Sequence, residues 1–234
     1  MDFVCESRHF IVEYHESERT CVEEVLNLLE ERYSHITEKT GRELKQKTTV
    51  KICSDRAELN QALGIEDAPE WIRGGIAAGK TVIASPLNPP PGSNYEQVIN
   101  TVVHEFTHVL IKEINAHIPR WLDEGIASYE GKDNHEAWIR NTVSEGLKNN
   151  RVPALADLDT GADFQEFFRR DGYQYSYTVV EYVTARYGYG KLMELVRRPE
   201  KLEETFQMTE EEFYRSWAAY LEENYGTDAD ERQK

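Results

Sequence analysis

Residues 98–110 read VINTVVHEFTHVL, and this stretch decides how the second half of the chain is interpreted. Its apolar residues recur every three to four positions, which predicts a helix over about 95–115. On such a helix His104 and His108 lie one turn apart on the same face, so their imidazole rings can share a metal ion. Zinc binds imidazole nitrogen readily and favours tetrahedral geometry. The spacing therefore predicts that His104 and His108 hold one zinc ion.

Glu105 stands next to the first histidine, where its carboxylate can lie near the metal without binding it. It can take a proton from a zinc-activated water, which makes Glu105 the predicted general base. Downstream, WLDEGIASY at 121–129 predicts a second helix after Pro119. A loop between the two helices can bring Glu124 back to the histidine pair. Two histidines and one glutamate leave a fourth zinc position open, as in a catalytic rather than a closed structural site.

HEFTH followed by PRWLDEGIASYE is similar to the gluzincin metallopeptidases, the group that contains thermolysin and the M1 aminopeptidases. It looks most like the small peptidase MA-like domains. The resemblance implies His104, His108 and Glu124 as zinc ligands and Glu105 as the catalytic base of a zinc-dependent metallopeptidase. The stretch between His108 and Glu124 is shorter than in thermolysin and the M1 enzymes, which implies a compact version.

Residues 173–183, YQYSYTVVEYV, resemble the helix of M1 enzymes that carries a catalytic tyrosine. Alignment on the VVEY portion puts Tyr173 in that position, where a phenol can donate a hydrogen bond to a developing oxyanion. Tyr175 and Tyr177 are rivals at adjacent helical phases. The alternative for all three residues is that they are core aromatics only.

The sequence predicts an α+β fold, with a small mixed α/β upper lobe, a mainly helical lower lobe and zinc in the cleft between them. The predicted domains are an N-terminal lobe at 1–92, a catalytic lobe at 93–226 and a charged tail at 227–234, in a single compact unit. Strands are predicted at 9–14, 48–53 and 80–85, the last in a hairpin. Helices are predicted at 18–40, 55–64, 95–115, after Pro119, and at 136–148, 164–169, 173–187, 191–197 and 210–225.

In gluzincins an edge strand of the upper lobe pairs with an extended peptide substrate. The order of elements, a strand, a loop and then the zinc helix, gives this position to the strand that contains Thr81, Val82, Ile83 and Ala84. An exposed edge there would supply main-chain hydrogen bonds. The alternative is an ordinary core or edge strand.

Ser128, one turn after Glu124, is either a partner that orients a ligating histidine or a small residue for helix packing. Asp123 is expected to face solvent.

The chain has 27 Lys and Arg residues against 43 Asp and Glu residues, a formal net charge of −16. So acidic a surface argues against nucleic acid and an anionic membrane as partners. No signal peptide or membrane-spanning stretch is visible, and the three cysteines form no CxxC motif. These features predict a cytoplasmic protein. They do not indicate its oligomeric state.

The predicted partner is a peptide or protein substrate. The acidic GxMEN motif of M1 aminopeptidases has no counterpart in GGIAAGK before the zinc helix, which favours an endopeptidase over an aminopeptidase. The alternative function is a catalytically silent, zinc-stabilised protein-interaction module. A third option is a zinc hydrolase that acts on a non-peptide amide.

Overall fold

The computed structural model describes residues 2–226, and the predicted tail at 227–234 lies outside them. The chain forms two compact units. The first unit comprises the residues up to Leu110 together with 130–133, and the second comprises 111–129 and the residues from Asn134 onward. A small mixed sheet and a majority of helices confirm the predicted α+β class. The predicted division between residues 92 and 93 stays a prediction.

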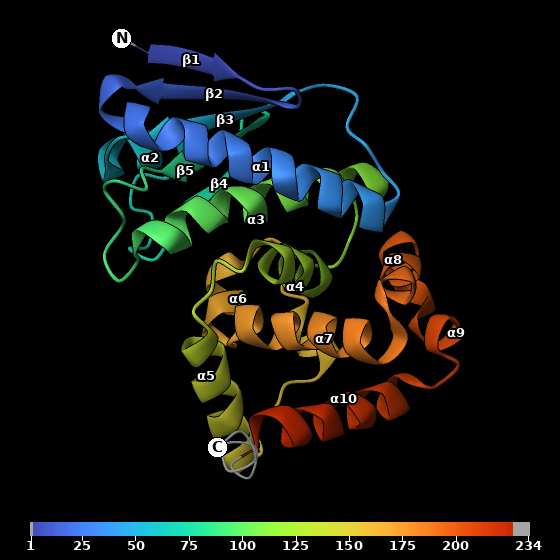
Figure 1. Cartoon of the computed structure of the whole chain (residues 1–234). Helices are drawn as coiled ribbons and strands as arrows, with labels where there is room; N and C mark the ends of the chain where they lie inside the picture. The colour runs from blue at the N-terminus through green and yellow to red at the C-terminus, as the bar shows by residue number, and fades with distance from the viewer. Residues whose placement is uncertain (1, 227–234) are drawn as a thin grey trace, which may run out of the picture. The chain divides into compact units, whose positions relative to one another are not determined.

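The first unit is built on a five-stranded sheet of order β1-β2-β3-β5-β4 (Figure 1). Its strands are β1 (Asp2–Glu6), β2 (Phe10–His15), β3 (Thr48–Cys53), β4 (Gly74–Ala77) and β5 (Lys80–Ala84). The pairs β2–β3 and β3–β5 are parallel, whereas β1–β2 and β4–β5 are antiparallel. The hairpin predicted to end in the strand after Lys80 is therefore confirmed.

Helices cover this sheet with apolar faces that the sequence pattern predicts. They are α1 (Arg19–Thr40), which follows the 3-10 turn η1 (Glu16–Glu18), α2 (Arg56–Leu63) and α3 (Tyr95–Ile114). The buried faces of α1 and α3 share one core with β2, β3 and β5. Gly41 ends α1 in the left-handed region, at φ +67°. The Asp55 side chain caps α2 by accepting the Glu58 N–H.

The second unit is helical and is arranged around α7 (Figure 1). Its elements are α4 (Arg120–Gly131, up to Tyr129), α5 (Glu136–Lys148), η2 (Leu155–Leu158), α6 (Phe164–Arg169), α7 (Gly172–Tyr187), α8 (Tyr189–Arg197), η3 (Pro199–Lys201), α9 (Leu202–Phe206) and α10 (Glu210–Tyr225). Helices α5, α6, α8 and α10 all pack against α7. Its valines, Val179, Val180 and Val183, are fully buried in the core of this unit.

The predicted helix bounds agree with the structure to within one or two residues, and those of α5, α6 and α10 coincide. The sequence pattern does not predict β1 or α9, both of which are only five residues long. Among residues 2–226, no helix combines the length and apolar character needed to cross a bilayer.

Gly125 is required where α4 packs against the main chain of α7. A Cβ at this position would lie 2.5 Å from the Ser176 carbonyl oxygen, and that oxygen belongs to helix backbone that cannot move aside. We expect Gly125→Ala to lower the free energy of unfolding by about 1–3 kcal/mol, measured by urea denaturation. Gly190→Ala in α8 is the matched control, because a Cβ there meets no atom within 4 Å. Equal stability changes in the two variants would contradict this packing.

Candidate metal centre

His104 and His108 lie on one face of α3, with 7% of each residue exposed. The apolar residues between and around them, including Val103 and Phe106, are buried in the core of the first unit and hold this part of the helix in place. The two Nε2 atoms are 3.1 Å apart. Zinc–nitrogen bonds of about 2.0–2.1 Å at a tetrahedral ion place two ligand nitrogens about 3.3 Å apart. The histidine pair therefore has the spacing of two ligands of one zinc ion.

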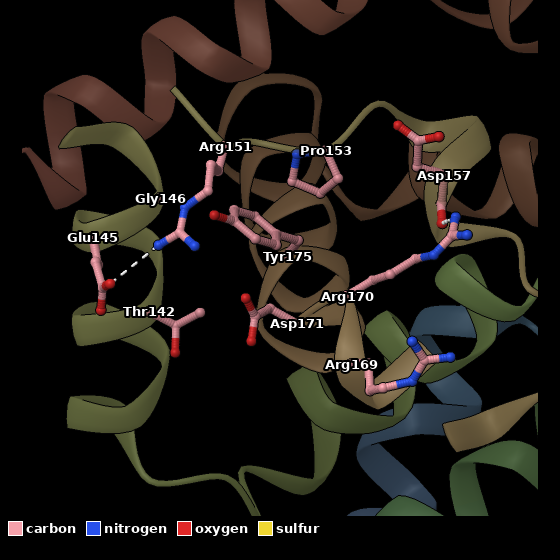
Figure 2. Close-up of a pocket in the computed structure, with 10 residues that line it drawn as sticks. All are labelled: Thr142, Glu145, Gly146, Arg151, Pro153, Asp157, Arg169, Arg170, Asp171 and Tyr175. Carbon is pink, nitrogen blue, oxygen red and sulfur yellow. Dashed lines mark hydrogen bonds and ion pairs between the residues drawn. The ribbon is translucent and has the colours of Figure 1, made fainter. Parts of the chain in front are cut away.

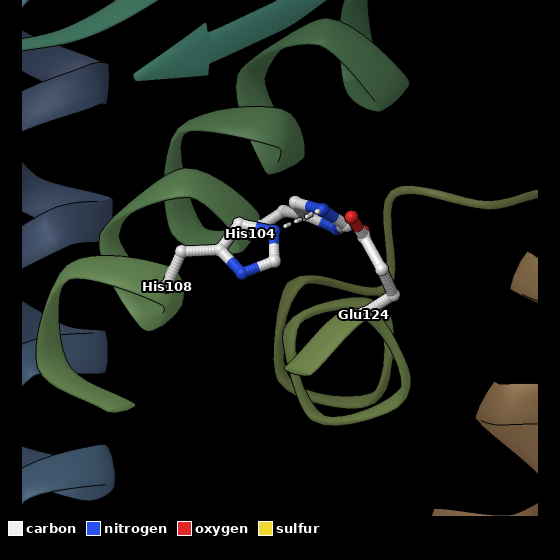
Figure 3. A group of neighbouring side chains, drawn as sticks. All are labelled: His104, His108 and Glu124. Carbon is white, nitrogen blue, oxygen red and sulfur yellow. Dashed lines mark hydrogen bonds between the residues drawn. The ribbon is translucent and has the colours of Figure 1, made fainter. Parts of the chain in front are cut away.

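A carboxylate from α4 completes the donor set (Figure 3). One donor atom from each of His104, His108 and Glu124 lies within 4.8 Å of the other two. Figure 3 shows the Glu124 carboxylate directed toward the imidazole rings. Two neutral nitrogens and one carboxylate are a donor set that zinc prefers, and they leave room for a fourth ligand. The residues present thus fit one zinc ion.

Gly131, at the end of α4, packs closely against α3 within the first unit. A Cβ at Gly131 would lie 2.9 Å from the His104 Cβ and 3.0 Å from its main-chain nitrogen, so only glycine allows this approach.

Asp133 contacts the first histidine of the predicted metal site. Its Oδ1 lies 3.2 Å from His104 Nδ1, and its Oδ2 lies 2.7 Å from Arg73 Nη2. A proton on Nδ1 that is donated to this carboxylate leaves the Nε2 lone pair available for a metal. Burial opposes ionisation of Asp133, but the His104 ring and the Arg73 guanidinium outweigh it and hold the pKa of the carboxyl below its ordinary value.

The sequence analysis gives Asp133 no role and offers Ser128 as the partner of a ligating histidine. For the Nδ1 atom of His104 the partner is Asp133, whereas the Ser128 hydroxyl accepts a hydrogen bond of 3.1 Å from the Asn134 amide. The one general rule that could have pointed to Asp133 is that a ligating histidine usually donates its second ring N–H to a carboxylate. Asp123 and Glu130 stand equally near in sequence, so that signal does not single out Asp133.

Asp123 and Glu130 are both buried, and the expectation that Asp123 faces solvent is wrong. Asp123 lies 3.5 Å from the Lys112 ammonium nitrogen. Glu130 accepts hydrogen bonds of 3.0 Å from both Arg32 and Lys39 of α1. Two cations on one buried carboxylate fix the end of α4 against α1 within the first unit.

Glu105, the predicted general base, is also 7% exposed and follows His104 directly on α3. Arg120 precedes Glu124, the third predicted ligand, by one turn of α4. Its Nη1 lies 3.5 Å from the Glu124 Oε1. The same guanidinium donates to the Gly161 carbonyl at 2.6 Å. Arg120 thus restricts the Glu124 carboxylate from within the second unit.

The three candidate tyrosines of α7 have different surroundings. The Tyr173 ring meets the Phe167 ring edge to face, with centroids 4.9 Å apart, and the Tyr177 ring lies 5.8 Å from that of Tyr129 on α4. Tyr175 is buried and lines a pocket of the second unit with residues of α5 and α6 and three arginines (Figure 2). Burial raises its pKa to about 12. Its hydroxyl is directed at Gly146, where a Cβ would lie 1.8 Å away.

Tyr175 lines this pocket of the second unit, and the oxyanion role of a tyrosine of α7 stays a prediction.

The predicted substrate strand is not at the edge of the sheet. Thr81, Val82 and Ile83 of β5 pair with β3 on one side and β4 on the other, and Ala84 pairs with β3. The main chain of these residues is therefore engaged within the sheet, and the expectation of an exposed edge at this strand is wrong. The edge on this side is β4, which forms the outer arm of the hairpin.

Comparison with known proteins gives one family. A model of the peptidase MA superfamily matches residues 30–222, which include the HEFTH helix, Glu124 and all three tyrosines. No curated protein matches the chain.

Proposed function

The chain belongs to the peptidase MA superfamily, and from this premise we propose that it hydrolyses peptide bonds with one zinc ion held by His104, His108 and Glu124. The family supports a metallopeptidase-like domain. The observation that carries the proposal is that donor atoms of two imidazoles and one carboxylate lie within 4.8 Å of one another, and that Glu105 follows the first of these histidines in the sequence. This donor set keeps one zinc position open, which a purely structural site does not need.

In the proposed reaction Glu105 is the general base. When bound, zinc would supply Lewis acidity, which lowers the pKa of a water molecule and polarises the scissile carbonyl. The Glu105 carboxylate takes one proton from the attacking water and later gives it to the leaving amine. Asp133 keeps the His104 proton on Nδ1 throughout, so that Nε2 remains a ligand.

A tyrosine of α7 is proposed to stabilise the oxyanion. Tyr173 is the first candidate, by the alignment of its helix with that of M1 enzymes, and Tyr177 is the second. Burial raises the pKa of Tyr177, which keeps its phenol protonated and able to donate a hydrogen bond. Loss of turnover in only one of Tyr173→Phe and Tyr177→Phe would identify the donor.

The proposed substrate is an extended peptide that pairs with the edge strand β4. This strand begins at Gly74, where a Cβ would lie 3.0 Å from the Thr101 Cγ2 on α3. Thr101 precedes His104 by three residues, so the edge begins within one helical turn of the first ligand. Main-chain pairing at an edge holds a peptide without selecting its sequence, which suits an endopeptidase.

The direct test is incubation of the zinc-loaded protein with a mixed peptide library, with cleavage sites mapped by mass spectrometry. Internal cuts are expected. Cuts confined to the first residue would make the protein an aminopeptidase. Bound zinc without any cut would favour the alternative, a zinc-stabilised protein-interaction module.

A further inference from the structure

Arg73 takes part in a chain of buried polar groups that reaches the first proposed zinc ligand. Its Nη2 lies 2.7 Å from Asp133 Oδ2, and Asp133 Oδ1 lies 3.2 Å from His104 Nδ1. The exposed fraction of the two paired side chains is 15% for Arg73 and 4% for Asp133. Each oxygen of the Asp133 carboxylate therefore has its own partner, and a charge-assisted bond to an arginine is among the stronger contacts that a buried carboxylate can make.

The main chain of Arg73 is fixed as firmly as its side chain. Its carbonyl oxygen accepts a hydrogen bond of 2.7 Å from the Ala84 N–H of β5. The next residue, Gly74, opens the edge strand β4, and a Cβ there would clash with the Val82 carbonyl oxygen at 2.8 Å. Arg73 thus contacts Asp133 through its side chain and directly precedes the edge strand β4 in the main chain.

We propose that Arg73 is a positioning residue, which orients His104 through Asp133 and ties that orientation to the start of the edge strand β4. The inference rests on the proposed function, since it concerns the same zinc site. With one oxygen held by Arg73, the Asp133 carboxylate can present the other oxygen to His104 in only a narrow range of directions. Without the guanidinium, Asp133 can rotate away and His104 loses its fixed tautomer and ring orientation.

The test measures zinc affinity, which does not depend on hydrolysis. We expect Arg73→Gln to weaken zinc binding by about tenfold, measured by competition with a chelator of known affinity, with Arg73→Lys between it and the parent protein. In the Asp133→Asn background the same Gln substitution should cause no further loss, because Arg73 acts through Asp133. The zinc-saturated Gln variant should show a reduced kcat with KM little changed.

Arg56→Gln is the matched control. Arg56 donates to main-chain carbonyls of the segment before β4, including that of Ile72 at 3.0 Å, and the contacts described for it do not involve Asp133. It should lose stability but keep the zinc affinity of the parent protein. If the role of Arg73 is only structural, Arg73→Gln and Arg56→Gln should have the same zinc affinity, or Arg73→Gln should raise KM and leave zinc affinity unchanged. Either result would overturn the proposal.

Three outcomes separate this inference from the proposed function. Unchanged zinc affinity in Arg73→Gln, or additive losses in the double variant, would reject the role of Arg73 while leaving the zinc site standing. A parent protein that binds no zinc would reject both. If Arg73→Gln does not fold, Arg73→Lys carries the same comparison, because its single ammonium can replace only part of the guanidinium contact.

Discussion

Glu105→Gln is expected to retain one zinc ion per chain and to lose peptide hydrolysis. Glutamine has almost the same shape as glutamate, so α3 and the histidine pair should keep their packing. An amide cannot accept the water proton, and removal of a positioned general base lowers kcat by about 10²–10⁴-fold. The measurement is kcat on a peptide that the parent protein cleaves, with zinc content determined on the same sample.

Glu113→Gln is the control for this substitution, since Glu113 is an exposed residue near the end of the same helix. It makes the same chemical change and should leave turnover unaffected. Undiminished hydrolysis by Glu105→Gln at full zinc content would remove Glu105 from the role of base. Loss of zinc from that variant would instead make Glu105 part of the metal site.

Glu124→Ala is expected to reduce zinc affinity more than substitution of a residue that acts through a ligand, such as Arg73. Structural zinc sites with four ligands bind with about 10–16 kcal/mol, or about 3 kcal/mol for each ligand. Loss of one of three protein ligands should therefore weaken binding by at least about 100-fold. The chelator competition used for Arg73 measures this change directly.

Glu136→Ala is the corresponding control, because it removes an exposed carboxylate from the first turn of α5 and should leave the zinc affinity of the protein as it is. An unchanged zinc affinity in Glu124→Ala would mean that another residue is the third ligand. A loss that is equal in Glu124→Ala and Glu136→Ala would point to a general effect of acidic charge.

Local sequence patterns predicted most helices and three of the strands. The apolar periodicity that predicts a helix such as α3 depends only on neighbouring residues. The order of strands depends on pairing between distant segments, such as Val50 with Thr81, and no local pattern encodes it. For that reason the sequence predicted the hairpin correctly but left open whether its second strand lies at the edge of the sheet or inside it.

In the candidate site too, the residues within local motifs could be predicted from the sequence, whereas those brought in by tertiary contacts could not. His104, His108 and Glu124 lie within two short motifs, so their spacing was enough to predict that they come together. The Arg73–Asp133 pair beside the site and the Glu130–Arg32 pair at the end of α4 are tertiary contacts between residues 60 and 98 positions apart. Many acidic and basic residues surround them in this highly charged chain, so composition and spacing could not single them out.

A zinc titration of the metal-free protein tests whether hydrolysis depends on one zinc ion and on Glu105. Peptide hydrolysis is followed while zinc is added in steps to the parent protein and to Glu105→Gln. We expect hydrolysis by the parent protein to rise to a plateau at one equivalent of zinc, while the variant binds the same equivalent and stays inactive. Hydrolysis by the metal-free protein, or zinc binding by the parent protein without hydrolysis of any peptide, would contradict it.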